Sequence, residues 1–206
     1  MRPQAVIFDI GKVLLEWDPE PFYDRVIGQE QRRALFEAVD LYTMNEAVDL
    51  GAHFQDTVYA LADQHPEWQN EIRMWHDRWI EMAHQDIPHS ARLLRALKAK
   101  GVPVFSLTNF GIQTLELAGR HYSVLTEFDR EYVSGHLQVI KPDPAIYEAL
   151  ERDCAIPPEA LIFTDDRPEN TAAAAARGWQ VHLFDGPQGW ADRLVQTGLL
   201  TPQESA

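Results

Sequence analysis

Four short fragments, well separated along the chain, carry side chains that can do chemistry. They contain a carboxylate, a hydroxyl, an amine and a pair of carboxylates, in the segments 6–11 (VIFDIG), 106–109 (SLTN), 141–144 (KPDP) and 162–166 (IFTDD). The first, second and fourth segments end apolar runs that are typical of buried parallel strands. Because the carboxyl ends of parallel strands share one edge of a sheet, where open α/β folds bind ligands, we expect these polar groups to meet there.

The elements that must position these groups alternate between strand and helix. Such alternation predicts an α/β fold with a doubly wound, Rossmann-like parallel sheet and right-handed crossovers. The predicted strands cover residues 5–9, 102–107, 131–133, 160–164 and 181–184, and the predicted helices between and beside them cover residues 90–100, 112–121, 143–154 and 168–177.

The middle of the chain interrupts this alternation with a helical pattern. We read residues 19–87 as an inserted helical cap, and residues 1–18 together with 88–206 as the α/β core. Within the insert, Ile72, Trp75, Trp79 and Met82 recur at helical spacing and form one face, which favours packing inside the cap. The alternative is that one of the two tryptophans projects toward a substrate.

The order and types of the four fragments resemble the haloacid dehalogenase-like (HAD) hydrolase superfamily, whose members are mostly phosphatases. One position departs from the phosphatase pattern: Gly11 stands where a second Asp usually serves as general acid and base. The segment 8–13 (FDIGKV), with Asp18 nine residues after Asp9, is similar to a subgroup of sugar-phosphate phosphatases that carry Gly there.

The resemblance implies a role for each polar group. Asp9 would attack phosphorus and form an aspartyl-phosphate that water then hydrolyses. Thr108 would donate its hydroxyl to a phosphate oxygen, and Asn109 would orient the phosphate or the nucleophile. Lys141 would lie between Asp9 and the phosphoryl group and offset their mutual repulsion. Each residue alone also fits an ordinary turn or surface position; their order favours the functional reading.

The resemblance also implies Mg²⁺ as cofactor. Asp9, Asp166 and the backbone carbonyl of Gly11 would be its ligands, while Asp165 would lie behind them and Asn170 would complete the polar network. An Asp-Asp pair before a helix can instead serve as an N-cap. Repulsion between two adjacent buried carboxylates makes a cation the better explanation.

Gly11 leaves the usual acid and base of this chemistry missing. General acid-base catalysis typically contributes about 10²- to 10⁴-fold to a rate, so another group must supply it or the enzyme is slow. Asp18, at the point where the chain leaves the core for the cap, is the candidate substitute.

Composition and net charge limit the classes of molecule that this chain could bind. The chain has 206 residues and a net charge of −14, without a basic run, which argues against nucleic acid. No apolar run is long enough for a membrane span, and Cys154 is the only cysteine. The first strand follows Met1 almost at once and leaves no room for a signal peptide, so we expect a cytoplasmic protein. We expect the polar tail, residues 201–206, to fray.

Three functions fit this pattern. The leading one is a magnesium-dependent phosphatase for a small phosphorylated metabolite, with a sugar phosphate as one candidate. The second is a 2-haloacid dehalogenase, which would use the same Asp9 without a metal and gains nothing from the Asp165–Asp166 pair. The third is a catalytically weak binding protein, an alternative that remains because Gly11 replaces the usual acid and base.

Overall fold

The computed structural model describes residues 1–206. Its centre is a parallel five-stranded sheet in the order β5-β4-β1-β6-β7. The strands are β1 (Ala5–Phe8), β4 (Val104–Thr108), β5 (Arg130–Val133), β6 (Leu161–Asp165) and β7 (Gln180–Leu183). Since β1 is central and the chain fills first one side of it and then the other, the strand order reverses beside β1, which is where such sheets bind ligands. The predicted α/β fold is confirmed.

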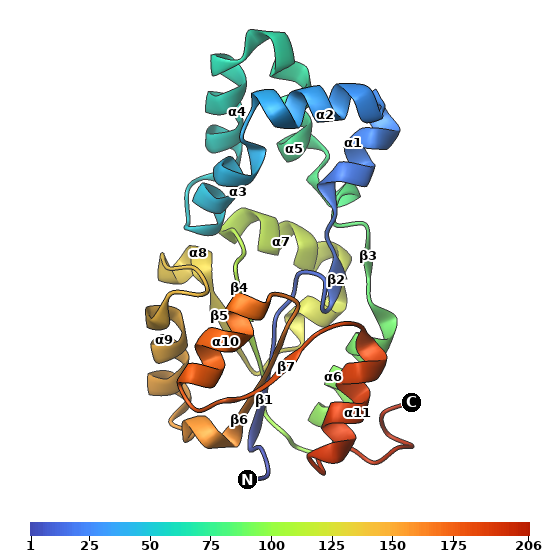
Figure 1. Ribbon diagram of the computed structural model, residues 1–206, viewed down its shortest axis with the longest axis vertical. Helices are drawn as coiled ribbons and strands as arrows, with labels where there is room; N and C mark the ends of the chain where they lie inside the picture. Colours follow the sequence, from blue (N-terminus) through green and yellow to red (C-terminus); the bar gives the residue numbers. More distant parts are fainter.

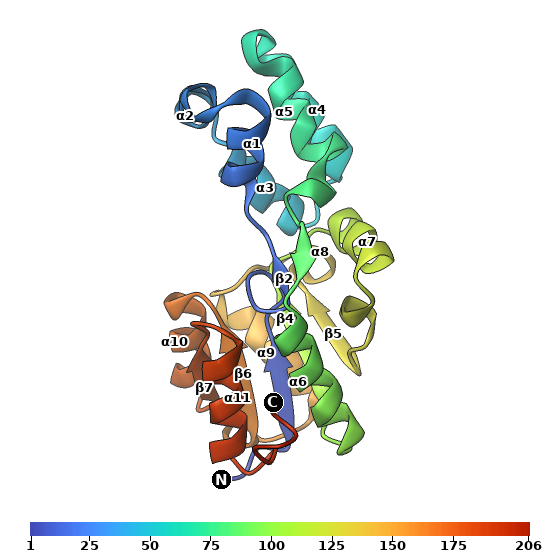
Figure 2. The same cartoon turned by 90° about the vertical axis from the view of Figure 1, so that its right-hand side faces the viewer.

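Helices cover both faces of this sheet (Figures 1 and 2). They are α6 (Pro88–Ala99), α7 (Ile112–His121), α8 (Ser134–Leu137), α9 (Pro144–Cys154), α10 (Pro168–Ala176) and α11 (Pro187–Gln196). Side chains alternate along β1: Val6 and Phe8 join the larger core with α6 and α11, whereas Ala5 and Ile7 join the smaller core with α9 and α10. This period of two follows from the pleat of a strand with both faces buried.

A layer of helices stands at one end of the sheet (Figures 1 and 2). It consists of α1 (Pro19–Ile27), α2 (Gln29–Ala38), α3 (Leu41–Asp49), α4 (Phe54–Gln64) and α5 (Gln69–Asp77). The face predicted from residue 72 to residue 82 is buried, with Ile72, Trp75, Trp79 and Met82 all at most 3% exposed. Trp75 lies within an aromatic cluster, and its indole N–H donates to Asn45 Oδ1 over 3.1 Å.

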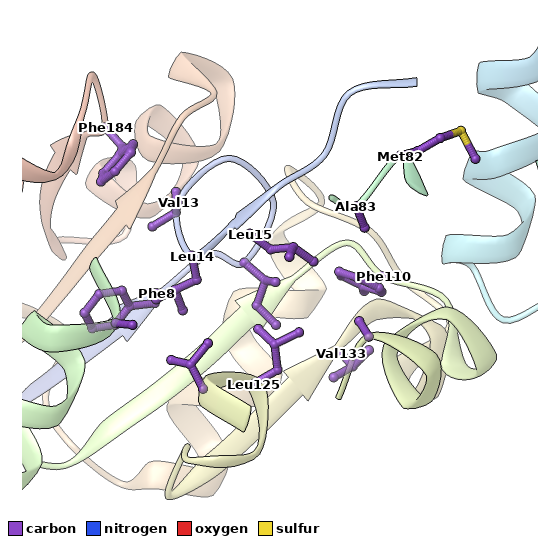
Figure 3. Close-up of a cluster of buried hydrophobic side chains, with 14 of the residues drawn as sticks. Phe8, Val13, Leu14, Leu15, Met82, Ala83, Phe110, Leu125, Val133 and Phe184 are labelled. Carbon is purple, nitrogen blue, oxygen red and sulfur yellow. The ribbon is translucent and has the colours of Figure 1, made fainter. Parts of the chain in front are cut away.

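The connection between the helical layer and the sheet contains a small ribbon that the sequence did not predict. Strands β2 (Leu15–Glu16) and β3 (Gln85–Asp86) pair antiparallel on the two chain segments that enter and leave the layer. Leu14 and Leu15 on the first segment and Met82 and Ala83 on the second all belong to the larger core; Leu14 lies near Phe8, whereas Met82 points toward the helical layer (Figure 3). These contacts join the two crossing segments to the larger core.

Two further expectations differ from the structure. Helix α11 was not predicted; it buries Trp190 and Leu194 against the larger core. The tail is not frayed: Lys100 Nζ lies 2.8 Å from Glu204 Oε2, and the ring of His89 lies 2.8 Å from the carbonyl of Ser205. No helix combines the length and apolarity needed to cross a membrane.

Candidate active site

The four fragments do meet at one edge of the sheet. Asp9 follows β1, Thr108 ends β4 and Asp165 ends β6, and both β4 and β6 pair directly with β1. Lys141 comes from the loop before α9, and Asn170 from the first turns of α10. Strand order therefore brings together residues that lie far apart in the chain.

Lys141 is at the centre of this edge and is 3% exposed. Its ammonium lies 2.8 Å from Asp9 Oδ1 and 2.6 Å from Asp165 Oδ2, and it donates to the carbonyl of Leu107 over 2.9 Å. Although burial alone lowers the pKa of a lysine, the carboxylates of Asp9 and Asp165 raise the pKa of Lys141 above its ordinary value. The ammonium has three N–H donors and three partners, so it is a fixed positive charge.

Asp9 is buried except for one side of its carboxyl group. Its Oδ1 accepts the N–H of Ile10 over 2.7 Å and faces Lys141, whereas Oδ2 takes part in no hydrogen bond. Burial raises the pKa of Asp9 to about 7, and the charge of Asp165 adds to this while Lys141 opposes it. A carboxylate oxygen is thus left for a ligand while the other oxygen fixes its orientation.

Asp165 is fully buried and fully engaged. Asn170 Nδ2 donates to both of its oxygens over 3.0 Å, and the N–H of Arg167 donates to Oδ1 over 2.8 Å. Together with the ion pair to Lys141, these bonds satisfy the carboxylate. We call Asp9, Lys141, Asp165 and Asn170 the floor of the site.

A divalent cation fits beside this floor. Carboxylate oxygens of Asp9, Asp165 and Asp166 lie within 4.8 Å of one another. Asp166 is half-buried and its side chain makes no hydrogen bond or ion pair to another residue. Burial together with the charge of Asp165 raises its pKa. Hard cations such as Mg²⁺ prefer such oxygens, so the free oxygens of Asp9 and Asp166 are the ones able to hold one.

Asn109 has a structural role that the sequence analysis did not predict. Its side chain clamps the backbone of Lys141: Nδ2 donates to the Lys141 carbonyl over 3.0 Å, and Oδ1 accepts the Lys141 N–H over 2.7 Å. The hydroxyl of Thr108 is buried without a partner, and Thr108 is not among the residues that line the cavity. Asn109 therefore fixes the position of Lys141, and Thr108 holds an unused donor beside the site.

A cavity of about 610 Å³ opens above the floor. Side chains of the helical layer form its other wall, and we call the α3 residues Asn45, Glu46 and Asp49 the roof. Aromatic rings complete the lining, from Trp17, Tyr42, Trp79 and Phe110. Of the two tryptophans considered from the sequence, Trp79 reaches the cavity and Trp75 does not.

Asp18 lies outside this lining. It is the N-cap residue of α1, and its backbone N–H donates to the carbonyl of Met82 over 3.0 Å. The cavity is instead lined by its neighbour Trp17.

Asp49 is the roof residue that the sequence analysis missed. Burial raises its pKa to about 7, and the charges of Glu46 and Asp9 add to the effect, while the N–H of Gly111 and the amide of Asn45 oppose it. The one signal in the sequence is an acidic residue at the last position of α3, where the helix dipole disfavours negative charge.

Gly11 lines the cavity, but the backbone conformation at this position does not require a glycine. It does not have a positive φ, and a Cβ atom built on it meets nothing within 4 Å. The left-handed conformation falls on Lys12, with φ of 56°. The chain does turn here, with the N–H groups of Val13 and Leu14 donating to the carbonyl of Ile10, but the turn does not require glycine at position 11, which has room for a side chain.

Comparison with known proteins agrees with this geometry. The model of the haloacid dehalogenase-like hydrolase family matches residues 3–178. The chain is 29% identical to the sesquiterpene phosphatase astK of Aspergillus oryzae, over 88% of this chain and 90% of that protein. It is 29% identical to an (S)-2-haloacid dehalogenase of Pseudomonas fluorescens, over 51% of this chain and 46% of the dehalogenase. It also matches drimenol cyclase drtB of Aspergillus calidoustus at 26% identity, but spans only 34% of that protein.

Solved structures share the fold at low sequence identity. A HAD family enzyme of Bacteroides thetaiotaomicron, in complex with magnesium and inorganic phosphate, superposes with a TM-score of 0.65 at 20% identity, over 87% of this chain and 93% of that one. The L-2-haloacid dehalogenase of Xanthobacter autotrophicus gives 0.63 at 18% identity, over 98% and 86%. With the family model covering most of the chain and the motif residues meeting at one sheet edge, this protein belongs to the haloacid dehalogenase-like hydrolases.

Proposed function

We propose that this hydrolase is a magnesium-dependent phosphatase that acts on a small phosphorylated metabolite through an aspartyl-phosphate. The observation that carries the proposal is a cluster of three carboxylates, two of which are paired with one buried lysine. A displacement at carbon by Asp9 alone needs no further acids, whereas a dianionic phosphate approaching a carboxylate needs compensating positive charge.

In this proposal Asp9 Oδ2 attacks phosphorus while Oδ1 stays held by Ile10 and Lys141. The bond from phosphorus to the leaving oxygen breaks, and that oxygen takes a proton. Water then attacks the aspartyl-phosphate and releases inorganic phosphate and the free carboxylate. Lys141 reduces the repulsion between Asp9 and phosphate through its charge, because its donors are already engaged.

Mg²⁺, held by Asp9, Asp166 and the carbonyl of Gly11, would neutralise phosphate charge. Asp165 and Asn170 would keep Lys141 and the neighbouring carboxylates in place. Residues 19–87 would act as the cap over a core of residues 1–18 and 88–206, closing the cavity and selecting the substrate.

The cavity wall suggests what the substrate carries beyond its phosphate. Trp17, Trp79 and Phe110 offer ring surfaces that can pack against an apolar group or the face of a sugar ring. A sugar phosphate and a phosphorylated isoprenoid are both suitable candidates, the second because a sesquiterpene phosphatase is among the relatives.

The test is release of inorganic phosphate from a panel of sugar, isoprenoid and aryl phosphates, with Mg²⁺, with EDTA, and with Asp9→Asn as the control. We expect turnover that needs both the metal and Asp9. A separate readout is the melting temperature, which Mg²⁺ should raise for the wild type and much less for Asp166→Asn.

Dehalogenation is the second candidate, because dehalogenases match about half of the chain. Halide release from 2-chloropropionate that depends on Asp9 and is indifferent to EDTA would support it. Tight phosphate-ester binding without turnover of either substrate class would instead support a binding protein.

A further inference from the structure

The carboxylate that Gly11 lacks has a counterpart on the opposite wall of the same cavity. Asp49 and Gly11 both line this cavity, together with Asp9. Because both side chains line one cavity of about 610 Å³, a substrate bound there can contact both of them.

Asp49 is held in place although it belongs to the helical layer. Ser134 Oγ in the core donates to the backbone carbonyl of Asp49 over 2.5 Å, and Asn45 Nδ2 donates to its Oδ2 over 2.9 Å. The backbone N–H of Gly111 also donates to this carboxyl group. The end of α3 is therefore fixed to the core at a residue that lines the same cavity as the nucleophile.

Backbone packing around Asp49 is close on both sides. A Cβ atom on Gly111 would lie 2.6 Å from Val48 Cγ1, and a Cβ atom on Gly51, where φ is +103°, would lie 2.6 Å from the carbonyl oxygen of Gly135. Only glycine allows these approaches, which bring the end of α3 onto the loop after β4 and onto α8. The roof is anchored at this point.

We propose that Asp49 is the general acid and base of the reaction, in place of the carboxylate missing at position 11; this rests on the proposed phosphatase function. As Asp9 Oδ2 bonds to phosphorus and the bond to the leaving oxygen breaks, Asp49 gives its proton to that oxygen and becomes a carboxylate. When water attacks the aspartyl-phosphate, Asp49 takes a proton from it, and the bond between phosphorus and Asp9 breaks. The cycle consumes one water and returns both carboxyl groups to their starting states.

The surroundings of Asp49 suit this role. The charged groups that act on it are Glu46 on its own helix and Asp9, both negative. The other charged residues that line the cavity are the acids Asp166 and Glu169 and the cations Lys12, Lys141 and Arg167. With a pKa of about 7, Asp49 can be protonated for the first step and ionised for the second at neutral pH. Asp18, the candidate from the sequence, does not line the cavity.

The experiment compares two aryl esters that differ in how much they need an acid. The leaving group of phenyl phosphate requires a proton, whereas that of 2,4-dinitrophenyl phosphate departs as a stable anion. For Asp49→Asn we expect kcat/KM to fall by about 10²- to 10³-fold with phenyl phosphate and by less than about 10-fold with the dinitrophenyl ester. Retained activity on the second ester also shows that the variant is folded.

Two control variants distinguish proton transfer by Asp49 from a general effect of removing a negative charge near the cavity. Glu46→Gln removes a negative charge one helical turn away, and Asp18→Asn removes the competing candidate; each should change both esters by a similar factor. Adding Gly11→Asp to Asp49→Asn should recover most of the phenyl phosphate activity, because position 11 has room for a side chain.

The pH dependence gives a further readout. In the wild type, kcat/KM for phenyl phosphate should decline above about pH 7 as Asp49 loses its proton, and this decline should be absent in Asp49→Asn. Equal losses on both esters in Asp49→Asn, or a loss selective for phenyl phosphate in Asp18→Asn, would overturn the proposal while leaving the phosphatase intact. A wild type that hydrolyses neither ester with Mg²⁺ would refute the phosphatase function itself.

Discussion

Asp165 on the floor of the cavity and Asp49 on its roof are buried acidic residues with opposite surroundings. On the floor, Asp165 is fully buried, yet Lys141, Asn170 and a backbone N–H satisfy it. On the roof, Asp49 has no cation as a hydrogen-bond partner, and burial raises its pKa to about 7. The difference shows that one site can combine a buried carboxylate whose oxygens all have donors with a carboxyl group that burial makes able to exchange a proton near neutral pH.

The largest effect is expected from the floor. Lys141→Met removes the cation shared by Asp9 and Asp165 and leaves two buried carboxylates without a charge partner. We expect a loss of about 3–5 kcal/mol in the free energy of unfolding, measured with urea, and no detectable turnover. Unchanged stability would show that the two carboxylates take up protons or water freely. Asp165 would then not differ from Asp49 in its need for a charge partner.

The anchor of the roof comes next. Ser134→Ala removes the hydroxyl that donates to the Asp49 carbonyl and accepts the N–H of Phe110. Two buried backbone groups lose a partner, so we expect a cost of about 1–3 kcal/mol. The same variant should loosen the end of α3, which amide hydrogen exchange of Asp49 to Gly51 would report. Exchange that stays at the wild-type rate would mean that the glycine contacts alone hold the roof.

The third prediction concerns the charge of Asp49, which Asp49→Asn removes, and its effect on the free energy of unfolding. The folded-state pKa of Asp49 is raised, so its ionisation costs folding energy that appears as pH rises from the unfolded pKa toward about 7. The variant should therefore be more stable than the wild type above pH 7, by on the order of 1 kcal/mol, and gain little below pH 4. Melting temperatures at pH 4, 6 and 8 measure this; a constant difference would show that the effect is one of shape.

Gly11→Ala is expected to have the smallest effect. Because the backbone there is not left-handed and a Cβ atom has free space, the substitution should leave stability unchanged or raise it by about 0.4–1 kcal/mol. Gly111→Ala is the matched control, since its Cβ atom would collide with Val48 beside the roof. Gly111→Ala should lower the melting temperature, whereas Gly11→Ala should leave it unchanged or raise it.

Local sequence patterns predicted the floor well. Apolar runs ending in Asp9, Thr108 and Asp165 indicated strands whose ends meet, and helix α7 was predicted at its observed bounds, Ile112–His121. Prolines in the first turns of α9 and α10 marked where these helices begin. Each of these signals lies within a few residues of the feature it predicts.

Other contacts left no such signal. Asn109 looked like a turn residue, yet it clamps the backbone of Lys141. Strands β2 and β3 are two residues each, too short for a periodic pattern, and Glu204 docks the tail through Lys100. All three depend on which segments packing brings together.

By itself, the sequence determined the alternating α/β core, the helical insert and the identity of the groups at the sheet edge. These features follow from hydrophobic patterns that can be recognised within short stretches of the chain. Only the tertiary structure decided that Asp49 and Asp9 line one cavity, that Lys141 has no free donor, and that Gly11 stands beside open space. The first of these facts arises from the close approach of α3 to the loop after β4 and to α8. An approach of this kind depends on the absence of side chains at Gly51 and Gly111 and on contacts between distant segments, which no local pattern encodes.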